Sequence, residues 1–151
     1  MIKLLCVGKL KEKYFQEAVA EYEKRLSKYT KLRMIEVADC SYDDIEKVKE
    51  KEGEELLKHI DERDYVITLA IEGKQLDSLS FAKTLDQLEM QGKNLCFVIG
   101  GSYGLSSSVL KHSQMSLSFS SMTFPHQLFR VLFLEQLYRA YKINNNEKYH
   151  K

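Results

Sequence analysis

The residues best suited to chemistry lie in two loops in the last third of the chain. In the first, the apolar run Val98-Ile99 leads into Gly100-Gly101-Ser102-Tyr103-Gly104. In the second, residues 117–124 are rich in Ser and Thr and end at the one proline, Pro125. Glycines leave backbone donors and acceptors accessible, hydroxyls add more, and the apolar neighbours offer walls for a purine. The two loops together predict a site for a small adenosine-like ligand.

Two familiar nucleotide-binding turns do not fit these glycines. A nicotinamide-binding turn requires G-x-G-x-x-G after the first strand and an acidic residue about 20 positions later. Here Gly-Gly-x-x-Gly follows a later strand, and no Asp or Glu lies between Glu89 and Glu135. A P-loop is excluded because Gly104 is followed by Leu105-Ser106 rather than by Lys and a hydroxyl residue. On the glycines alone, a purely structural turn remains open.

The elements that must position these loops alternate between strands and helices. Apolar runs predict strands at Ile2–Val7, Leu32–Val37, Tyr65–Ile71, Leu95–Ile99 and Met115–Phe119. Helical periodicity predicts helices over Glu12–Tyr29, from a cap within Ser41–Asp44 to Asp61, from a cap at Ser80 to Gln91, and over Gln127–Lys142. Glu72-Gly73-Lys74 is expected to form a turn. This order predicts a single α/β domain, residues 1–151, with a largely parallel sheet flanked by helices.

The last of these helices is unusually apolar around its circumference. Ten of its residues are apolar or aromatic: Leu128, Phe129, Val131, Leu132, Phe133, Leu134, Leu137, Tyr138, Ala140 and Tyr141. A helix that is apolar all round must be buried. In a chain of 151 residues, contact with a second subunit is one way to bury such a helix, which predicts a homodimer. Burial within a single subunit is the alternative.

Composition excludes several classes of protein. Hydrophobic residues make up 44% and charged residues 30% of the chain, which is typical of a globular domain. No apolar run approaches the roughly 20 residues needed to cross a bilayer, so no membrane association is expected. Cys6, Cys40 and Cys96 are odd in number and form no CxxC pair, which favours reduced thiols in the cytoplasm. The four histidines lack ligand spacing, so no metal site is expected.

The net charge of +1 conceals basic ends and an acidic middle. Residues 1–33 carry nine Lys or Arg against four Asp or Glu, whereas residues 34–100 carry eight against sixteen. A surface built from the two ends is suited to a polyanion, although uneven charge is also common without any such partner. The basic residues available as phosphate contacts are Lys9, Lys11, Lys13, Arg25, Lys28, Arg130, Arg139 and Lys142.

Motifs along the whole chain resemble the ribosomal large subunit methyltransferase H family of the SPOUT superfamily. The matching stretches are Cys6-Val7-Gly8-Lys9, Lys51-Glu52-Gly53-Glu54, Val66 to Lys74, Ile99 to Leu105, Leu117-Ser118 through Pro125-His126, Arg130-Val131-Leu132, Glu135 to Ala140 and Tyr149-His150-Lys151. The resemblance implies a C-terminal trefoil knot, a homodimer and S-adenosylmethionine as cofactor. It further implies that the cofactor contacts Leu69, Gly100, Gly101, Gly104, Phe119, Ser120, Ser121, Met122, Thr123 and Phe124.

The same resemblance implies methylation of N3 of a pseudouridine in a stem-loop of 23S ribosomal RNA, on the assembled 70S ribosome. Such a reaction must remove the N3 proton, and His is suited to accept a proton near neutral pH. His126 and His150 are the candidates, with Tyr149 beside His150 as a second substrate-site group. Two other roles remain open. His126 could only terminate the loop, and His150 could only contact phosphate.

The polar tail Asn144–Lys151 shows no apolar periodicity, so it is expected to add little to the core. Two other functions also remain open. One is a ribosome- or RNA-binding module without enzymatic activity, which would use the basic ends. The other is a SPOUT methyltransferase that acts on transfer RNA.

Overall fold

The structure, a computed structural model, describes residues 1–151 and contains five strands and five helices. In chain order they are β1 (Ile2–Val7), α1 (Lys13–Leu26), β2 (Leu32–Val37), α2 (Ile45–Leu57), β3 (Asp64–Gln75), α3 (Ser78–Met90), β4 (Asn94–Ile99), α4 (Ser107–His112), β5 (Met115–Ser118) and α5 (His126–Asn144). The strands form one sheet in the order β2-β1-β4-β3-β5, and every neighbouring pair is parallel. The α/β fold with a parallel sheet flanked by helices is therefore confirmed.

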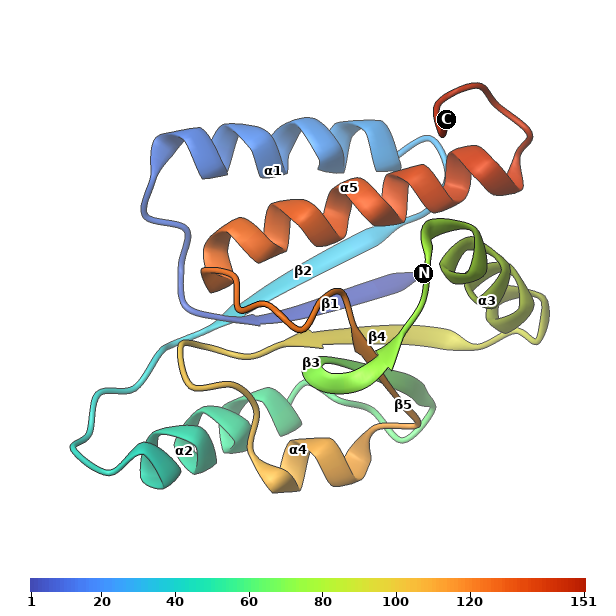
Figure 1. The fold of residues 1–151 in the computed structure, drawn as a ribbon. Coiled ribbons are helices and arrows are strands. Elements are labelled where there is room, and N and C mark those ends of the chain that lie inside the picture. The colour runs from blue at the N-terminus through green and yellow to red at the C-terminus, as the bar shows by residue number, and fades with distance from the viewer.

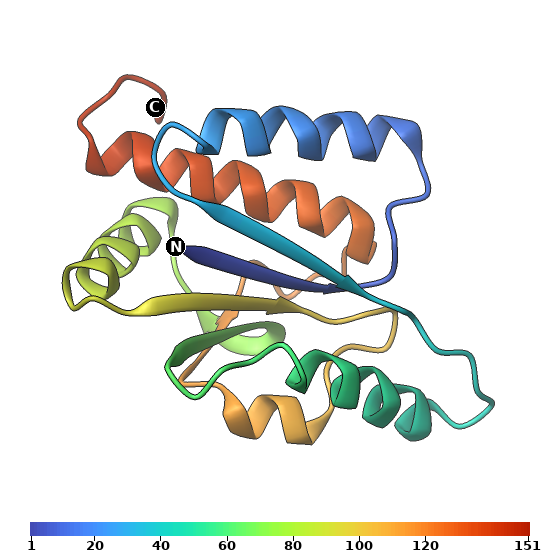
Figure 2. The ribbon, with the colours of Figure 1, turned by 180° about the vertical axis from the view of Figure 1, so that it is seen from behind.

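Helices cover both faces of this sheet. Helices α1 and α5 lie on one face, and α2 and α4 lie on the other (Figures 1 and 2). Successive residues of a strand point to opposite faces, and β1 supplies both cores. Ile2 and Leu4 belong to the larger core, with residues of α1, α3 and α5, whereas Leu5 and Val7 belong to the smaller core, with residues of α2 and α4. Two covered faces explain why the strands appear in the sequence as continuous apolar runs.

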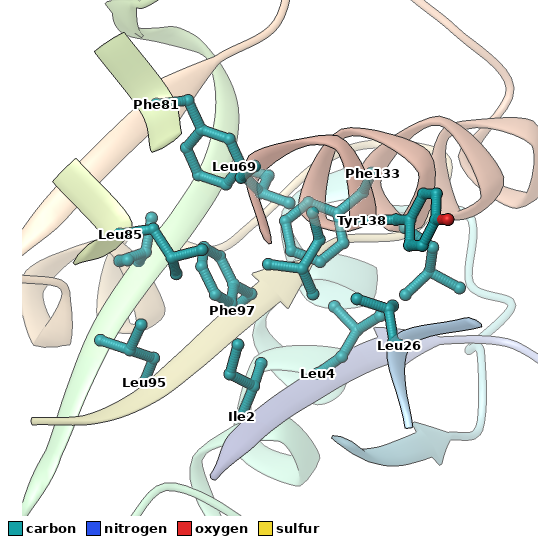
Figure 3. Close-up of a cluster of buried hydrophobic side chains, with 14 of the residues drawn as sticks. Ile2, Leu4, Leu26, Leu69, Phe81, Leu85, Leu95, Phe97, Phe133 and Tyr138 are labelled. Atoms are coloured by element: carbon teal, nitrogen blue, oxygen red, sulfur yellow. The ribbon is translucent and has the colours of Figure 1, made fainter. Parts of the chain in front are cut away.

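Helix α5 owes most of its apolar character to burial within its own chain. Phe133 and Leu134 are fully buried, and the Phe133 ring centroid lies 4.7 Å from that of Phe97 in β4. Figure 3 shows Phe133 and Tyr138 facing Leu4, Leu26 and Phe97 across the larger core. The inner residues of α5 therefore need no partner subunit, and only its remaining half-buried residues are available to one.

The turn expected at Glu72-Gly73-Lys74 is wrong, because β3 continues to Gln75. Here β3 shifts register against β5, so that both Leu69 and Lys74 are aligned with Leu117. A Cβ atom added to Gly73 would lie 2.7 Å from the backbone nitrogen of Leu117. Glycine is required at this position because the two backbones pass each other in close contact.

Several helix ends also differ from expectation for local reasons. Asp77, not Ser80, caps α3, because its carboxylate accepts a hydrogen bond from the Ser80 backbone N–H at 2.7 Å.

Helix α2 begins after Asp44, which lies within the expected cap, but ends at Leu57 rather than Asp61. Beyond it, the buried Lys3 ammonium donates to the His59 carbonyl at 2.8 Å and holds that segment in a turn. Helix α1 ends at Leu26, and β5 ends at Ser118. None of the five helices combines the length and apolarity that crossing a bilayer requires.

Helix α4 is only six residues long, too short for a periodic pattern to predict it. Its cap is the buried Ser106, whose hydroxyl accepts a hydrogen bond from the Val109 N–H at 3.3 Å. Ser106 follows directly on the glycine loop, so the cap also fixes where that loop ends.

We predict that Ser106→Ala lowers the free energy of unfolding by about 1 kcal/mol, because the Val109 N–H loses its buried acceptor. Urea denaturation measures this loss. Ser107→Ala is the matched control, since Ser107 is exposed and caps nothing. Equal midpoints for the two variants would contradict the assignment of the cap.

Candidate functional site

A cavity of about 750 Å³ opens where β4 and β5 end, beside residues 69–72 of β3, the point at which β3 stops pairing with β4. Because the carboxyl ends of parallel strands share one edge of a sheet, the loops that follow β4 and β5 meet there. Nine of the ten residues expected to contact a cofactor line it: Leu69, Gly100, Gly101, Gly104, Phe119, Ser120, Met122, Thr123 and Phe124. The tenth, Ser121, is exposed outside the lining, and its hydroxyl accepts from the Gln75 side-chain amide at 3.3 Å.

The glycine loop owes its shape to its three glycines. The Gly104 N–H donates to the Gly101 carbonyl at 3.1 Å, and Gly104 has a φ of +86°, which side chains disfavour. A Cβ atom on Gly100 would lie 2.8 Å from the backbone carbon of Gly104. Gly100 and Gly104 are therefore required by the turn itself, which exposes backbone groups to the cavity.

The second loop forms the opposite, aromatic wall of the cavity. The Phe119 and Phe124 rings lie with their centroids 5.0 Å and 6.2 Å from that of Phe129 in α5. Within the loop, the Met122 N–H donates to the Ser120 hydroxyl at 3.0 Å. At 73% exposure Met122 lies on the rim rather than in the wall. The cavity thus has apolar side chains on one wall and accessible backbone groups on the other. This suits a ligand with a flat aromatic part and several polar atoms.

His126 also lines this cavity, at the first residue of α5. Burial, aided by the charge of Arg130, lowers the pKa of its imidazole, so that the ring is neutral at pH 7. A neutral imidazole can accept a proton. Arg130 itself is 1% exposed and donates to the Gly8 carbonyl at 2.9 Å and to Glu36. Its expected role as a phosphate contact is therefore wrong, because no RNA can reach it.

The other basic residues divide into two groups. Lys9 and Lys11 are exposed just before α1, form no ion pair and remain available to a polyanion. The rest are already paired: Lys13 with Glu17 at 3.9 Å, Arg25 with Glu21 at 3.1 Å, Lys28 with Glu147 at 3.6 Å, Arg139 with Glu135 at 2.7 Å and Lys142 with Glu147 at 3.1 Å. No three His, Cys, Asp or Glu side chains come together as a set of metal ligands.

The tail lies at the far end of α5 from His126. Thirteen residues separate His126 from Arg139, about 20 Å along a helix, and Arg139 contacts the tail. Its guanidinium lies 4.7 Å from the Tyr149 ring centroid and 3.2 Å from Nδ1 of His150. The Tyr149 ring also packs edge-on against Tyr138 at 5.0 Å. The expectation that the tail adds little to the core is wrong, because Tyr149 packs against the larger core.

A second cavity, of about 380 Å³, adjoins the first. It shares Leu117, Phe119 and Phe124 with the first cavity and adds Leu76, Asp77, Ser78, Phe81, Leu132, Glu135 and Gln136. The pKa of Asp77 is lowered mainly by its hydrogen bonds with Ser80 and further by the charge of nearby His150. By geometry, His150 is connected to the second cavity through two side chains, because Glu135 lines that cavity, Arg139 pairs with Glu135, and Arg139 contacts His150.

Arg139 was expected from the sequence only as a phosphate contact, and no role was expected for Glu135 or for a pair formed by the two. Their i,i+4 spacing on the last helix is the signal that identifies them as a pair. In the structure this pair joins the second cavity to His150, since Glu135 lines the cavity and Arg139 contacts the imidazole.

Comparison with known proteins identifies the class. A family model described as "Predicted SPOUT methyltransferase" matches residues 1–150. Solved structures agree in fold: a probable methylase family protein from Haemophilus influenzae aligns with a TM-score of 0.59 at 14% identity, covering 99% of this chain and 70% of that one. A putative methylase family protein from Neisseria gonorrhoeae aligns with a TM-score of 0.57 at 8% identity, covering 99% and 86%.

Curated relatives narrow the class further. Proteins named "Ribosomal RNA large subunit methyltransferase H" from Clostridium botulinum (strain Alaska E43 / Type E3) and from an Exiguobacterium species are 52% and 53% identical over 157 residues. Each alignment covers 99% of this chain and 99% of the relative. The chain therefore belongs to the ribosomal RNA large subunit methyltransferase H family of SPOUT methyltransferases.

Proposed function

We propose that this protein methylates N3 of a pseudouridine in 23S ribosomal RNA, using S-adenosylmethionine and acting on the 70S ribosome in the cytoplasm. The names of its full-length relatives support the methyltransferase activity and the ribosomal RNA substrate. The observation that carries the proposal is the cavity at the ends of β4 and β5, where the two loops that follow these strands meet residues 69–72 of β3.

The residues of this cavity fit the proposed cofactor. Its volume of about 750 Å³ lies within the range of small-molecule sites. Backbone of the glycine loop can bind the polar edge of an adenine, while Leu69 and Phe119 contact its faces. When bound, S-adenosylmethionine supplies a methyl group activated by its sulfonium, so the protein needs no nucleophile of its own. The work left to the protein is alignment of the methyl group with the attacking nitrogen.

The base is proposed to enter from the side of the second cavity, which Glu135 and Arg139 connect to His150. Methylation of N3 forms an N–C bond and releases the N3 proton, which requires an acceptor. His150 is exposed, and its Nδ1 accepts a hydrogen bond from Arg139 in the ligand-free protein, so in this proposal Arg139 turns to a phosphate or the base and frees Nδ1 to receive the proton. His126 is the alternative acceptor, on the first cavity.

Methyl transfer to defined substrates tests this function. Radiolabelled S-adenosylmethionine would be incubated with purified 70S ribosomes, free 50S subunits and bulk transfer RNA. Label in 70S ribosomes alone is expected, and label in transfer RNA would instead support an enzyme of transfer RNA. A calorimetric titration without any S-adenosylmethionine binding would favour a ribosome-binding module.

We further propose a homodimer formed through the outer stripe of α5. Leu128, Val131, Leu132 and Glu135 follow one another at helical spacing and are only half buried in the single chain. The stripe borders the second cavity, which Leu132 and Glu135 line. A partner seated on it would exclude water from the place proposed for the base.

Leu132→Asp is expected to raise the dimer dissociation constant at least about 100-fold, because it would bury an unpaired carboxylate in the interface. Sedimentation velocity across a concentration series measures the change. Leu79→Asp is the control, since Leu79 is 55% exposed on α3. A wild-type protein that stays monomeric, or an unchanged Leu132→Asp dimer, would contradict the proposed interface.

A further inference from the structure

A buried carboxyl group lies behind the glycine loop, outside the cavity that the loop lines. Glu52 of α2 is 4% exposed, and its Oε2 accepts a hydrogen bond from the Cys40 N–H at 3.0 Å. Its Oε1 is buried and has no hydrogen-bond partner. Buried polar atoms without partners are rare in proteins and call for an explanation.

The Oε1 atom faces the backbone of the glycine loop. A Cβ atom on Gly101 would lie 3.0 Å from this oxygen and 3.1 Å from a methyl group of Val7. The next residue of α2, Gly53, lies against Ser106, because a Cβ atom there would overlap the Ser106 hydroxyl. Two consecutive residues of α2 therefore contact the loop at Gly101 and at its end, Ser106.

The surroundings of Glu52 are not those of a surface ion pair. No Lys or Arg forms a salt bridge with it, and the charged neighbour that influences it is Asp39. Burial raises the pKa of Glu52, the hydrogen bond from Cys40 opposes this, and Asp39 adds to the increase. The carboxyl group thus lies where its charge is disfavoured. Its contribution to the fold therefore comes from its shape and its contacts rather than from its charge.

We propose that Glu52 is a positioning residue that sets the place of the glycine loop in the cofactor cavity. Through Cys40 it ties the segment after β2 to α2, and through its contact with Gly101 it supports the loop from behind. Glu52 does not line the cavity, so it acts on the cofactor only through Gly101. This role rests on the proposed function, because it assumes that the cavity binds S-adenosylmethionine.

A double-mutant cycle between Glu52 and Gly101 tests the proposal. Gly101→Ala alone places a methyl group against Oε1 and displaces the loop, which should weaken S-adenosylmethionine binding about 10-fold. Glu52→Ala alone removes the support and should weaken binding by a similar factor. In the double variant the added methyl occupies the vacated space, so binding should be no weaker than in either single variant. Additive losses of about 100-fold in calorimetry would overturn the proposal.

Two variants serve as matched controls. Glu52→Gln keeps the size of the side chain and an acceptor for the Cys40 N–H, so its affinity should stay within about 2-fold of wild type. Glu54→Ala lies on the same helix, but its side chain is exposed, so it should have no effect. If thermal unfolding shows that Glu52→Ala does not fold, Glu52→Asp replaces it in the cycle, because the shorter side chain withdraws from Gly101 and keeps the carboxyl group.

Hydrogen exchange separates this inference from the proposed function. In the ligand-free protein, Glu52→Ala should speed amide exchange at Cys40 and at residues 101–106, and leave the amides of α3 unchanged. If the wild-type protein binds no S-adenosylmethionine, the proposed function fails and this measurement still decides the role of Glu52. Unchanged exchange in the loop would overturn that role.

Discussion

Replacing His150 with Ala is expected to reduce methyl transfer to 70S ribosomes by about 100-fold or more, while S-adenosylmethionine affinity stays at the wild-type value. The reason is spatial. His150 is connected to the second cavity through Arg139 and Glu135, whereas the cavity proposed for the cofactor lies beyond the wall formed by Phe119 and Phe124. Single-turnover transfer with saturating cofactor measures the effect, and calorimetry measures the affinity separately.

Lys151→Ala is the control for His150→Ala, because it changes an exposed neighbour in the same tail. If His150 accepts the N3 proton, the remaining rate should rise more steeply with pH than in wild type, since hydroxide must then replace the imidazole. If His150 only contacts RNA, the pH dependence stays unchanged while the rate falls. Wild-type turnover in the variant would show that the tail takes no part in the reaction.

A point substitution tests the tail more sharply than truncation does. Deleting Lys148–Lys151 would also remove the Tyr149 ring from its contacts with Tyr138 and Arg139. Loss of that packing would lower stability and free the Arg139 guanidinium, so a fall in activity would have several causes. Replacing the exposed His150 side chain keeps the Tyr149 ring in place and removes only one hydrogen bond of Arg139.

Gly100→Val is expected to weaken S-adenosylmethionine binding by about 100-fold or more. A Cβ atom at this position would lie 2.8 Å from the backbone carbon of Gly104 and 3.1 Å from Leu105. The loop must therefore open even in the ligand-free protein. Because the clash is confined to the loop, the far-UV circular dichroism spectrum should remain near wild type. Calorimetric titration measures the affinity.

Ser107→Val is the matched control for Gly100→Val, since it adds a similar branched side chain at an exposed position just after the loop. Its affinity should match that of the wild type. Wild-type affinity in Gly100→Val would place the cofactor away from the glycine loop and would also remove the basis for a positioning role of Glu52.

The strands and the candidate cavity were accessible from the sequence because their signals are local. Apolar runs such as Ile2–Val7 and Leu95–Ile99 mark strands covered on both faces, and the structure confirms both. Gly100 follows one such run, and Phe119 ends another, Met115–Phe119. Since parallel strands end at a common edge, the loops after them lie on the same side of the sheet, and the order β4-β3-β5 brings these two together. The shared cavity of these two residues follows from that rule.

Other features depend on contacts between distant segments, which no local pattern records. Only the folded chain places Gly73 against the backbone of Leu117, so β3 continues where a turn was expected. A charged helix such as α2 gives no sign that Glu52, unlike its neighbour Glu54, is buried. Burial depends on which neighbours arrive from elsewhere in the chain, and for Glu52 these are Cys40 and the glycine loop.

The tail shows, within a few residues, the same difference between what the sequence determines and what the tertiary structure determines. Its aromatic ring, imidazole and lysines identified it as a place where chemistry could occur. Its position against Arg139 depends on α5 lying between α1 and α3, an arrangement set by packing of the larger core. Residue types therefore followed from the sequence. The division into two cavities, here proposed for the cofactor and for the base, followed only from tertiary packing, because the aromatic wall between them is assembled from the loop after β5 and from α5.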